Sequence, residues 1–246
     1  MKTVVIIQAR MTSMRLSGKV LKNISGKPLL WHVIQRVKLS KHIDNVILAI
    51  PDTKENDILE KFSKDNNIKY FRGNEEDVLF RYYETAKKYG AELIVRITSD
   101  CPLIDPKIID KVIQIHKQKK VDYTSIGIKR TFPRGVDVEV FDFETLNKAH
   151  QKASKKEERE HVTLYIYTHP KIFKIQNIKA EKHLHHPELR ICVDTKEDLE
   201  LVQKIYKYLY KNQKIFYTED VVNLLVNQHP ELQKINQNIK QKKVNE

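Results

Sequence analysis

The chain has 246 residues, of which 40% are hydrophobic and 31% charged, so it can bury one substantial core, and a single α/β domain is ordinary at this length. It has no apolar leader and no long uncharged apolar run, which argues against a secreted or membrane-spanning protein and favours the cytoplasm. Its two cysteines, Cys101 and Cys192, lie far apart in apolar segments, which argues against a disulfide framework and suits a reducing compartment.

The net charge of +13 and the pI near 9.5 are compatible with nucleic acid, an anionic lipid surface or a small anionic substrate. Much of the excess charge comes from lysines on expected helix faces and in residues 233–246. A solvated basic surface is the simplest interpretation, and a role at a membrane surface stays open. Charge alone therefore does not select a partner.

Short β-branched runs alternate with amphipathic segments in the first half of the chain. Leu30, Val33, Ile34 and Val37 show helical spacing, and Gly90 marks the end of a later helix. In chain order we expect strand 4–9, helix 29–39, strand 46–50, helix 55–66, strand 69–71, helix 76–89 and strand 93–98. This alternation predicts a parallel sheet with covered faces, whose ligands sit beyond the carboxyl ends of the strands.

The second half of the chain has a mixed pattern, which opens with Asp105 as the N-cap and Pro106 as the first residue of a helix. The expected helices are 106–119, 143–154, 157–168, 196–210 and 218–226, and the expected strands are 121–125, 136–141, 173–176 and 189–193. Since no linker or repeat divides the chain, we expect one domain over residues 1–228, with a lid or acceptor region at about 125–190. Residues 229–246 are expected to form a mobile, basic, polar C-terminal tail.

The first strand ends in a loop of cations and hydroxyls, Gln8-Ala9-Arg10-Met11-Thr12-Ser13-Met14-Arg15-Leu16-Ser17-Gly18-Lys19. Arg10, Arg15 and Lys19 are close enough along this loop to bind the β and γ phosphates of a nucleotide, while Ser13, Ser17 and backbone N–H groups add hydrogen bonds. The Walker A spacing is absent, because a serine stands six residues before the lysine and a valine follows it. The loop therefore predicts a phosphate site that is not a P-loop, and surface charge is the alternative for the two arginines.

Several segments, in order, carry a family resemblance. They are ARMTSMRLSGKVL (9–21), ISGKPLL (24–30), RGNEEDVLFRY (72–82), VRITSDCPLIDP (95–106), FPRGVDVEVF (132–141), EREHVT (158–163) and VDTKEDLELV (193–202). Together they resemble the cytidylyltransferase family, which includes the CMP-KDO and CMP-sialic acid synthetases. The resemblance is strongest to the spore coat polysaccharide biosynthesis protein SpsF group, and it spans roughly residues 2–205.

The resemblance implies a Rossmann-like, three-layer α/β/α nucleotidyltransferase fold of the glycosyltransferase-A type, with a mixed, mostly parallel sheet. It also implies a homodimer that transfers CMP from CTP to a sugar acid or to a sugar or polyol phosphate, with release of pyrophosphate, for surface polysaccharide. In such a transfer the protein mainly positions the reactants and neutralises charge. The catalytic candidates for that task are Arg10, Arg15, Lys19 and Asp100.

Two carboxylates, Asp100 and Asp194, stand at expected strand ends. Mg²⁺ prefers hard oxygen ligands, usually one or two carboxylates with phosphate oxygens and waters. By resemblance to the KDO synthetases, these two aspartates bind the metal ion, Mg²⁺ or Mn²⁺. The plainer interpretations are a turn residue for Asp100 and an N-cap for Asp194. Ser99 and Ser17 replace a glycine and a proline that are usual in the family, which affects the loops more than the carboxylates.

By resemblance, the segment that begins at Arg72 approaches the base and ribose of the nucleotide. Asp77 is a second candidate there, although an N-terminal helix residue is an equally open interpretation. The complete predicted nucleotide site is Gln8, Ala9, Arg10, Ser13, Lys19, Arg72, Asp77 and Ser99. Backbone groups at the end of the first strand can read a small pyrimidine, but the choice of cytosine over uracil is implied by the family alone.

The acceptor candidates are Arg134, Asp137, Glu139, Glu160 and His161. On a strand, Asp137 and Glu139 share one face, where they can bind sugar hydroxyls while Arg134 meets a carboxylate or phosphate. The alternative is an edge strand with a charged solvent face. His161 fits a catalytic base or a paired surface residue of a helix equally well.

Two other functions stay open on the sequence. A nucleotide-sugar-dependent glycosyltransferase of the same fold usually needs a DxD-type metal motif, and the nearest candidate is Asp137-Val138-Glu139. A nucleic-acid-binding module needs basic and aromatic residues interleaved on one face, whereas the arginines here gather at a strand-end loop. We therefore expect CTP and a small anionic sugar acid or sugar phosphate as partners, no nucleic acid and no stable membrane insertion.

Overall fold

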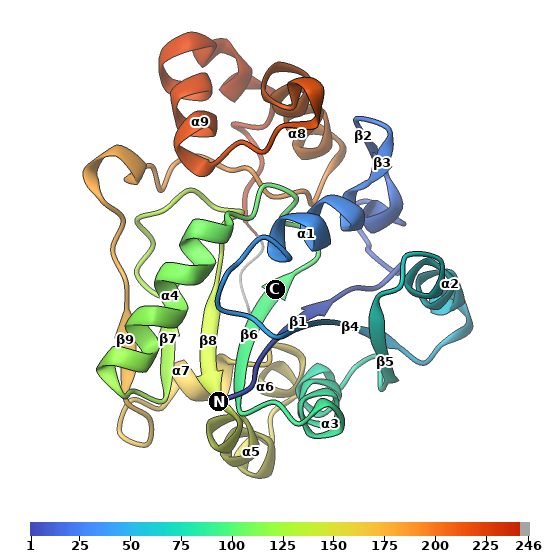
Figure 1. The fold of residues 1–246 in the computed structure, drawn as a ribbon, viewed down its shortest axis with the longest axis vertical. Coiled ribbons are helices and arrows are strands. Elements are labelled where there is room, and N and C mark those ends of the chain that lie inside the picture. Colours follow the sequence, from blue (N-terminus) through green and yellow to red (C-terminus); the bar gives the residue numbers. More distant parts are fainter. Residues whose placement is uncertain (242–246) are drawn as a thin grey trace.

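A seven-stranded mixed sheet forms the centre of the protein (Figure 1). The computed structural model describes residues 1–241. The strands are β1 (Thr3–Gln8), β4 (Asn45–Pro51), β5 (Lys69–Gly73), β6 (Leu93–Thr98), β7 (Tyr123–Ser125), β8 (Glu139–Asp142) and β9 (Ile175–Asn177), in the order β5-β4-β1-β6-β8-β7-β9. A separate hairpin is formed by β2 (Asn23–Ile24) and β3 (Lys27–Pro28).

The strands β5, β4, β1 and β6 are parallel, so their carboxyl ends meet at one edge of the sheet. Gln8, the last residue of β1, lies opposite Ala49 of β4 and Thr98 of β6. β8 runs antiparallel to β6 and places Glu139 opposite Arg96. The loops that follow β1 and β6 therefore start side by side.

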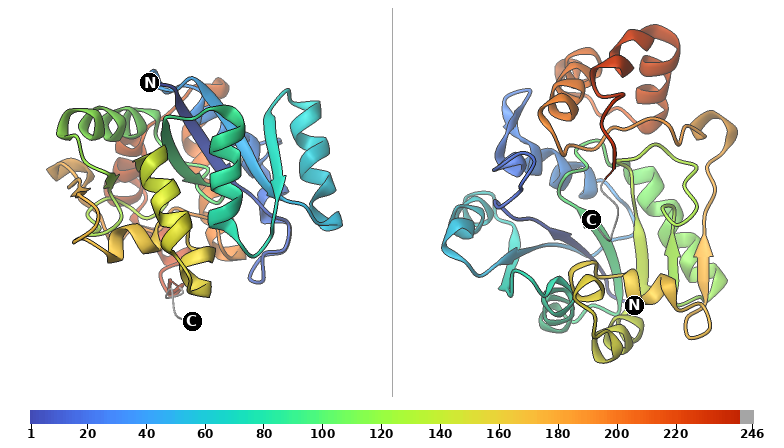
Figure 2. Two further views of the ribbon diagram at one scale, coloured as in Figure 1. Left: turned by 90° about the horizontal axis from the view of Figure 1, so that it is seen from below. Right: turned by 180° about the vertical axis from the view of Figure 1, so that it is seen from behind.

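Side chains alternate across β1, so each face of the sheet has its own core. The helices are α1 (Leu29–Val37), α2 (Asp57–Asp65), α3 (Val78–Tyr89), α4 (Pro106–Lys119), α5 (Phe143–Lys152), α6 (Lys156–Glu160), α7 (Leu164–Thr168), α8 (Lys196–Leu209) and α9 (Thr218–Asn223). Val5 and Ile7 pack with apolar residues of α1, α4 and α8, whereas Val4 and Ile6 pack with those of α3, α5 and α7. Figure 1 shows α1 and α4 in front of the sheet. The right-hand view of Figure 2 shows the molecule from behind, where the yellow segment that contains α6 covers the opposite face of the sheet. The predicted three-layer α/β/α fold is confirmed.

Local signals were accurate where they were strong. The expected strand 93–98 and helix 106–119 have those bounds in the structure, and the Asp105 side chain accepts a hydrogen bond from the N–H of Lys107 at 2.8 Å. Both cysteines are free and buried. No helix within residues 1–241 is long and apolar enough to cross a membrane.

The helix expected over 157–168 is wrong, because the chain forms two short helices, α6 and α7, in its place. His161 ends α6 with non-helical backbone angles, φ −101° and ψ 69°. Two residues later, the Thr163 hydroxyl donates a hydrogen bond to the Glu139 carboxylate at 2.9 Å. The break therefore turns Thr163 toward the sheet.

The strand expected over 189–193 is also wrong, since a single bridge joins this extended segment to Arg134. The Arg134 N–H donates to the Leu189 carbonyl at 2.8 Å, and the Ile191 N–H donates to the Arg134 carbonyl at 2.7 Å. Gly135 permits this approach, because its φ is +117° and a Cβ there would lie 2.6 Å from the Cys192 nitrogen. The crossing places Arg134 beside the chain that leads to Asp194.

The C-terminal tail expected from residue 229 is folded over much of its length. Pro230–Ile235 form a 3₁₀ helix, which follows a π-helical turn over Leu224–Gln228. Leu232 and Asn236 are buried. An apolar side chain every few residues anchors this segment in spite of its polar composition, and the last part of the expected tail, 242–246, lies outside the described residues.

Candidate active site

Lys19, Asp100 and Asp194 converge at the carboxyl edge of the parallel strands, as the sequence predicted. The Lys19 ammonium lies 2.8 Å from Asp194 Oδ1 and 3.4 Å from Asp100 Oδ2, and it donates a third hydrogen bond to the Val193 carbonyl at 2.9 Å. Lys19 follows Gly18, whose φ of +63° suits a glycine and turns the chain into a short 3₁₀ helix, Lys19–Leu21. One mostly buried cation therefore contacts both carboxylates.

The backbone fixes the two carboxylates relative to each other. Asp100 directly follows the loop residue Ser99 after β6, and its carbonyl accepts a hydrogen bond from the Val193 N–H at 2.8 Å. Asp194 is not the N-cap of α8, because Thr195 takes that role and accepts a hydrogen bond from the Asp198 N–H at 3.3 Å. The N-cap interpretation of Asp194 is therefore wrong, and its side chain is left for the site.

Three cations surround the Asp194 carboxylate. Besides Lys19, Arg15 lies 3.0 Å and Arg190 2.7 Å from Asp194 Oδ2. Burial opposes ionisation of Asp194, but the attraction of Lys19 and the hydrogen bonds from Lys19 and Arg190 outweigh it and lower its pKa to about 2. In return, although burial opposes charge on Lys19, Asp100 and Asp194 raise its pKa above the ordinary value.

The two carboxylates fit a magnesium ion that shares its ligands with a phosphate. Within residues 1–241, no group of three or more His, Cys, Asp or Glu side chains is placed to hold a metal ion. Mg²⁺ is commonly held by one or two carboxylates, with substrate phosphates and waters as the remaining ligands. The donor set of Asp100 and Asp194 therefore suits a metal ion that arrives with a nucleotide.

The phosphate loop is closed by its own backbone. The N–H groups of Ser13 and Gly18 both donate to the Met11 carbonyl, at 2.9 and 3.0 Å. The Ser13 N–H is therefore occupied within the loop, while the Arg10 side chain is exposed. Thr12 Oγ1 donates to Glu75 Oε1 at 2.6 Å, so this loop touches the loop that follows β5.

The end of β1 uses much of its backbone for the sheet. The Ala9 N–H donates to the Ala49 carbonyl at 3.3 Å, and the Gln8 carbonyl accepts from the Ser99 N–H at 3.3 Å. The Gln8 side-chain carbonyl accepts from Arg96 Nε at 3.2 Å. Gln8, Ala9 and Ser99 thus line up at the strand ends as expected, but these particular groups already have partners.

Two predicted nucleotide ligands have structural partners instead. Arg72 pairs with Asp57 at the start of α2 and with Glu60 one turn later, and it donates to the Thr53 carbonyl at 3.0 Å. The arginine therefore ties the end of β5 to α2, and its contact with the nucleotide stays a prediction.

Asp77 is the N-cap of α3, where it accepts from the Phe80 N–H at 2.8 Å, and it also binds the Arg159 guanidinium at 2.6 Å. The interpretation that Asp77 begins the helix is confirmed. Its carboxylate therefore has partners in α3 and α6, and its contact with the nucleotide stays a prediction.

The acceptor candidates do not gather as expected. Asp137 precedes β8 and pairs with Arg130 at 2.7 Å, whereas Glu139 pairs with Arg96 at 3.0 Å. The shared strand face is therefore wrong, and Asp137-Val138-Glu139 does not present two free carboxylates as a glycosyltransferase metal motif would. Glu160 is exposed at the end of α6. In the same segment, the Thr163 hydroxyl donates a hydrogen bond to the Glu139 carboxylate at 2.9 Å.

Arg134 is the acceptor candidate that the structure leaves most available. Its guanidinium is half-buried, and within residues 1–241 no carboxylate lies within ion-pair distance of it. Burial and the nearby Arg130 lower its pKa, and the attraction of the more distant Asp137 opposes them only in part. A half-buried guanidinium without a carboxylate favours an anionic ligand.

Several site residues were not predicted. Arg190 and Asp198 surround Asp194, and Arg81 lies under the loop after β5, where its Nη1 donates to the carbonyls of Asn74 and Glu75. Thr195-Lys196-Glu197-Asp198 carries the spacing of a capping box and could have been found from sequence. Arg190 and Arg81 carry no local signal, because their partners are set by tertiary packing.

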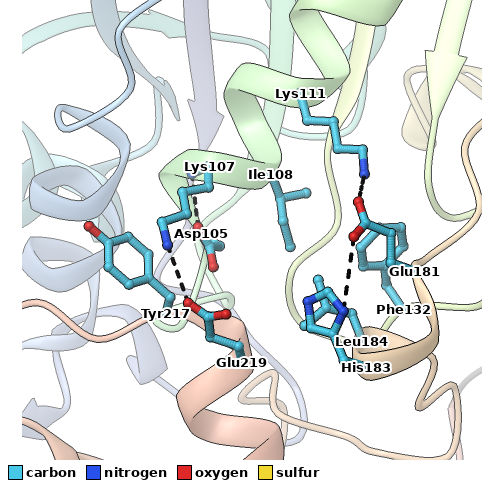
Figure 3. Close-up of a pocket in the computed structure, with 10 residues that line it drawn as sticks. All are labelled: Asp105, Lys107, Ile108, Lys111, Phe132, Glu181, His183, Leu184, Tyr217 and Glu219. Atoms are coloured by element: carbon cyan, nitrogen blue, oxygen red, sulfur yellow. Dashed lines mark hydrogen bonds and ion pairs between the residues drawn. The ribbon is translucent and has the colours of Figure 1, made fainter.

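A separate hollow lies between α4, α9 and the short 3₁₀ helix Lys182–Leu184 (Figure 3). Lys107 and Lys111 point down from α4 on either side of Ile108, and each meets a carboxylate, Glu219 at 3.2 Å or Glu181 at 2.5 Å. None of the predicted site residues lines this hollow. Both lysines are paired with carboxylates, and we assign no ligand to this hollow.

A mixed α/β sheet whose strand ends carry a loop of cations and hydroxyls, a mostly buried lysine and two carboxylates is typical of a nucleotidyltransferase. The model of a family described as Cytidylyltransferase matches residues 4–228, and the chain belongs to this family. It is therefore a CTP-dependent nucleotidyltransferase.

Relatives agree with this assignment. Over 231 residues the chain is 35% identical to the spore coat polysaccharide biosynthesis protein SpsF of Bacillus subtilis, covering 92% of this chain and 94% of the relative. An uncharacterized protein of Methanocaldococcus jannaschii is 34% identical over 100% of this chain and 99% of its own length. The solved structure of a cytidylyltransferase from Leptospira borgpetersenii superposes with a TM-score of 0.88 at 31% identity, covering 99% of this chain and 100% of that one.

The ionised Asp194 should contribute to stability above about pH 4. Because its folded pKa of about 2 lies below that of an unfolded aspartate, the contribution is lost as the pH falls from about 4 toward 2. We expect the difference in unfolding free energy between the wild type and Asp194→Asn to shrink by on the order of 2 kcal/mol over this range. Urea titrations at several pH values measure it.

Asp65→Asn, at a surface ion pair with Lys61, serves as the control and should show no comparable change. An Asp194→Asn difference that is constant with pH would contradict the ion-pair assignment.

Proposed function

We propose that this protein transfers CMP from CTP to a small anionic acceptor, a sugar acid or a sugar or polyol phosphate, with Mg²⁺ or Mn²⁺ as the cofactor and pyrophosphate as the second product. The observation that carries the proposal is the convergence of Lys19, Asp100 and Asp194 at the end of the phosphate loop. Nucleotidyl transfer needs this combination of a cation for the phosphates and hard oxygen ligands for a metal ion.

Asp100 and Asp194 would hold the metal ion, which supplies charge neutralisation at the phosphate that is attacked. Lys19 and Arg15, now paired with Asp194, are the cations nearest to that place, and Arg10 is exposed at the start of the same loop. When CTP binds, Nζ of Lys19 can donate to phosphate oxygens in place of Asp194. The partner of Lys19 thereby changes from the Asp194 carboxylate to the phosphates that leave as pyrophosphate.

Arg134 is the residue that we assign to the anionic group of the acceptor. It is half-buried and lacks a carboxylate partner among the described residues, and its backbone is bonded to the segment that ends in Asp194. The carboxylate of a sugar acid and the phosphate of a sugar phosphate both suit a guanidinium. A sugar acid would give a CMP-sugar, whereas a phosphate would give a CDP product.

The names of the relatives support an acceptor for glycan synthesis. SpsF is named for spore coat polysaccharide biosynthesis. A 3-deoxy-manno-octulosonate cytidylyltransferase of Geobacter sulfurreducens is 34% identical over 113 residues, which is 44% of that protein. We propose a surface polysaccharide pathway, a cytoplasmic location suited to the free thiols, and a homodimer, as the family resemblance implies.

The reaction is tested by pyrophosphate release with Mg²⁺, each of the four NTPs and a panel of sugar acids and sugar phosphates. We expect release with CTP and one class of acceptor. Asp100→Asn should lower turnover about 100-fold or more, because a metal ligand worth several kcal/mol is lost. The fold should survive, since the Asp100 side chain is 24% exposed and its backbone bond to Val193 remains.

Asp65→Asn again serves as the control and should keep wild-type turnover. Wild-type turnover in Asp100→Asn would refute the metal assignment, and absence of CTP binding to the wild-type protein would refute the reaction.

Substitution of Arg134 by alanine should raise the KM for the acceptor roughly tenfold or more and leave the KM for CTP nearly unchanged, because a charge-assisted hydrogen bond to the acceptor is lost. Steady-state kinetics with each substrate varied in turn separate the two constants. Lys129→Ala, an exposed cation five residues earlier, is the matched control. A raised KM for CTP with an unchanged KM for the acceptor would reverse the assignment.

A further inference from the structure

The C-terminal segment, residues 229–241, folds back onto Arg190 and Asp198, the two residues that support Asp194. Leu232 is buried, and the 3₁₀ helix Pro230–Ile235 packs against α8. Asn236 follows and is 5% exposed. The segment lies beyond residues 4–228, which the family model matches, so the family does not assign it a role.

Asp198 is the centre of this support. Its side chain has no exposed surface, and its carboxylate accepts five hydrogen bonds. Two come from the backbone N–H groups of Asp194 and Thr195, at 3.0 and 3.1 Å. Two come from Arg190 Nε and Nη2, at 2.9 and 3.0 Å. The fifth comes from Asn236 Nδ2 at 2.8 Å.

Asp198 and Arg190 together fix both ends of Asp194. Asp198 Oδ2 accepts the Asp194 N–H, which holds the backbone. The Nη2 group of Arg190 contacts Asp198 Oδ2 and also Asp194 Oδ2, at 2.7 Å, which holds the carboxylate. A shift of the Asp198–Arg190 pair therefore moves the side chain that we assign to the metal ion.

Asn236 joins the two members of that pair. Its Nδ2 donates to Asp198 Oδ1 and to the Arg190 carbonyl, at 2.8 and 3.0 Å. Five residues later, Gln241 Oε1 accepts from Arg190 Nη1 at 2.8 Å. Loss of the Asn236 amide would leave a buried carboxylate and a carbonyl each short of a donor, so the pair would have to rearrange.

We propose that Asn236 is a positioning residue of the active site, through which the C-terminal segment fixes the Arg190–Asp198 pair and with it the Asp194 carboxylate. This inference rests on the proposed function, because it takes Asp194 as a ligand of the metal ion. Partners of metal ligands commonly change metal affinity or activity by 10- to 100-fold when they are removed.

The test measures Mn²⁺ binding to the full-length protein with CTP and no acceptor, so that turnover does not contribute. Electron paramagnetic resonance reports the free Mn²⁺ in each titration. We expect Asn236→Ala to weaken Mn²⁺ binding roughly tenfold. Asn238→Ala, an exposed asparagine of the same segment, should bind Mn²⁺ as the wild type does.

A second variant ends the chain after Ile235, which removes Asn236 but keeps the buried Leu232. It should bind Mn²⁺ at least as weakly as Asn236→Ala, because it also removes Gln241, the partner of Arg190 Nη1. Wild-type Mn²⁺ affinity in either folded variant would overturn the inference, as would equal weakening in Asn238→Ala. If the wild-type protein itself does not bind Mn²⁺ with CTP, the metal site fails, and this inference fails with it.

Discussion

A single ammonium group, Nζ of Lys19, holds together two carboxylates from distant parts of the chain. Asp100 and Asp194 are 81 and 175 residues away from Lys19 in sequence, and without a cation between them two such charges would repel each other. Because this contact is mostly buried, its attraction is weakly screened by solvent. The phosphate loop, the end of β6 and the start of α8 are all constrained by it.

Asp194 also reduces the repulsion among the three cations that lie around it when no nucleotide is bound. Arg15, Arg190 and Lys19 all contact the Asp194 carboxylate. Arg190 also forms an ion pair with Asp198. The protein carboxylates therefore stand where phosphate charge is expected to arrive. Within residues 1–241 no carboxylate lies within ion-pair distance of Arg134, and for this reason we propose it as the cation that meets an anionic acceptor.

Strong local signals predicted much of the fold but only part of the site. Asp105 and Pro106 define the start of α4 by capping and by fixed backbone geometry, which depend on neighbouring residues alone. Arg72 and Asp77 were expected to meet a nucleotide, whereas the structure pairs them with Glu60 and Arg159, which come from other elements. Sequence spacing cannot show that a charged residue already has a tertiary partner.

The polar C-terminal segment is a second case in which tertiary contacts could not be predicted from the sequence. Its composition indicated a mobile tail, yet Leu232 and Asn236 are buried against α8 and the Arg190–Asp198 pair. Apolar contacts of Leu232 and Ile235 and the amide of Asn236, which is one of five donors to the buried Asp198 carboxylate, anchor it. Average composition does not report such single contacts.

The most direct test of the account is a crystal structure of the protein with CTP and Mn²⁺, in which anomalous scattering locates the metal ion. The account predicts a manganese peak between the Asp100 and Asp194 carboxylates, with the triphosphate on the loop of residues 10–19 and Nζ of Lys19 on a phosphate oxygen. A manganese peak away from these two carboxylates, or a triphosphate bound outside that loop, would contradict it.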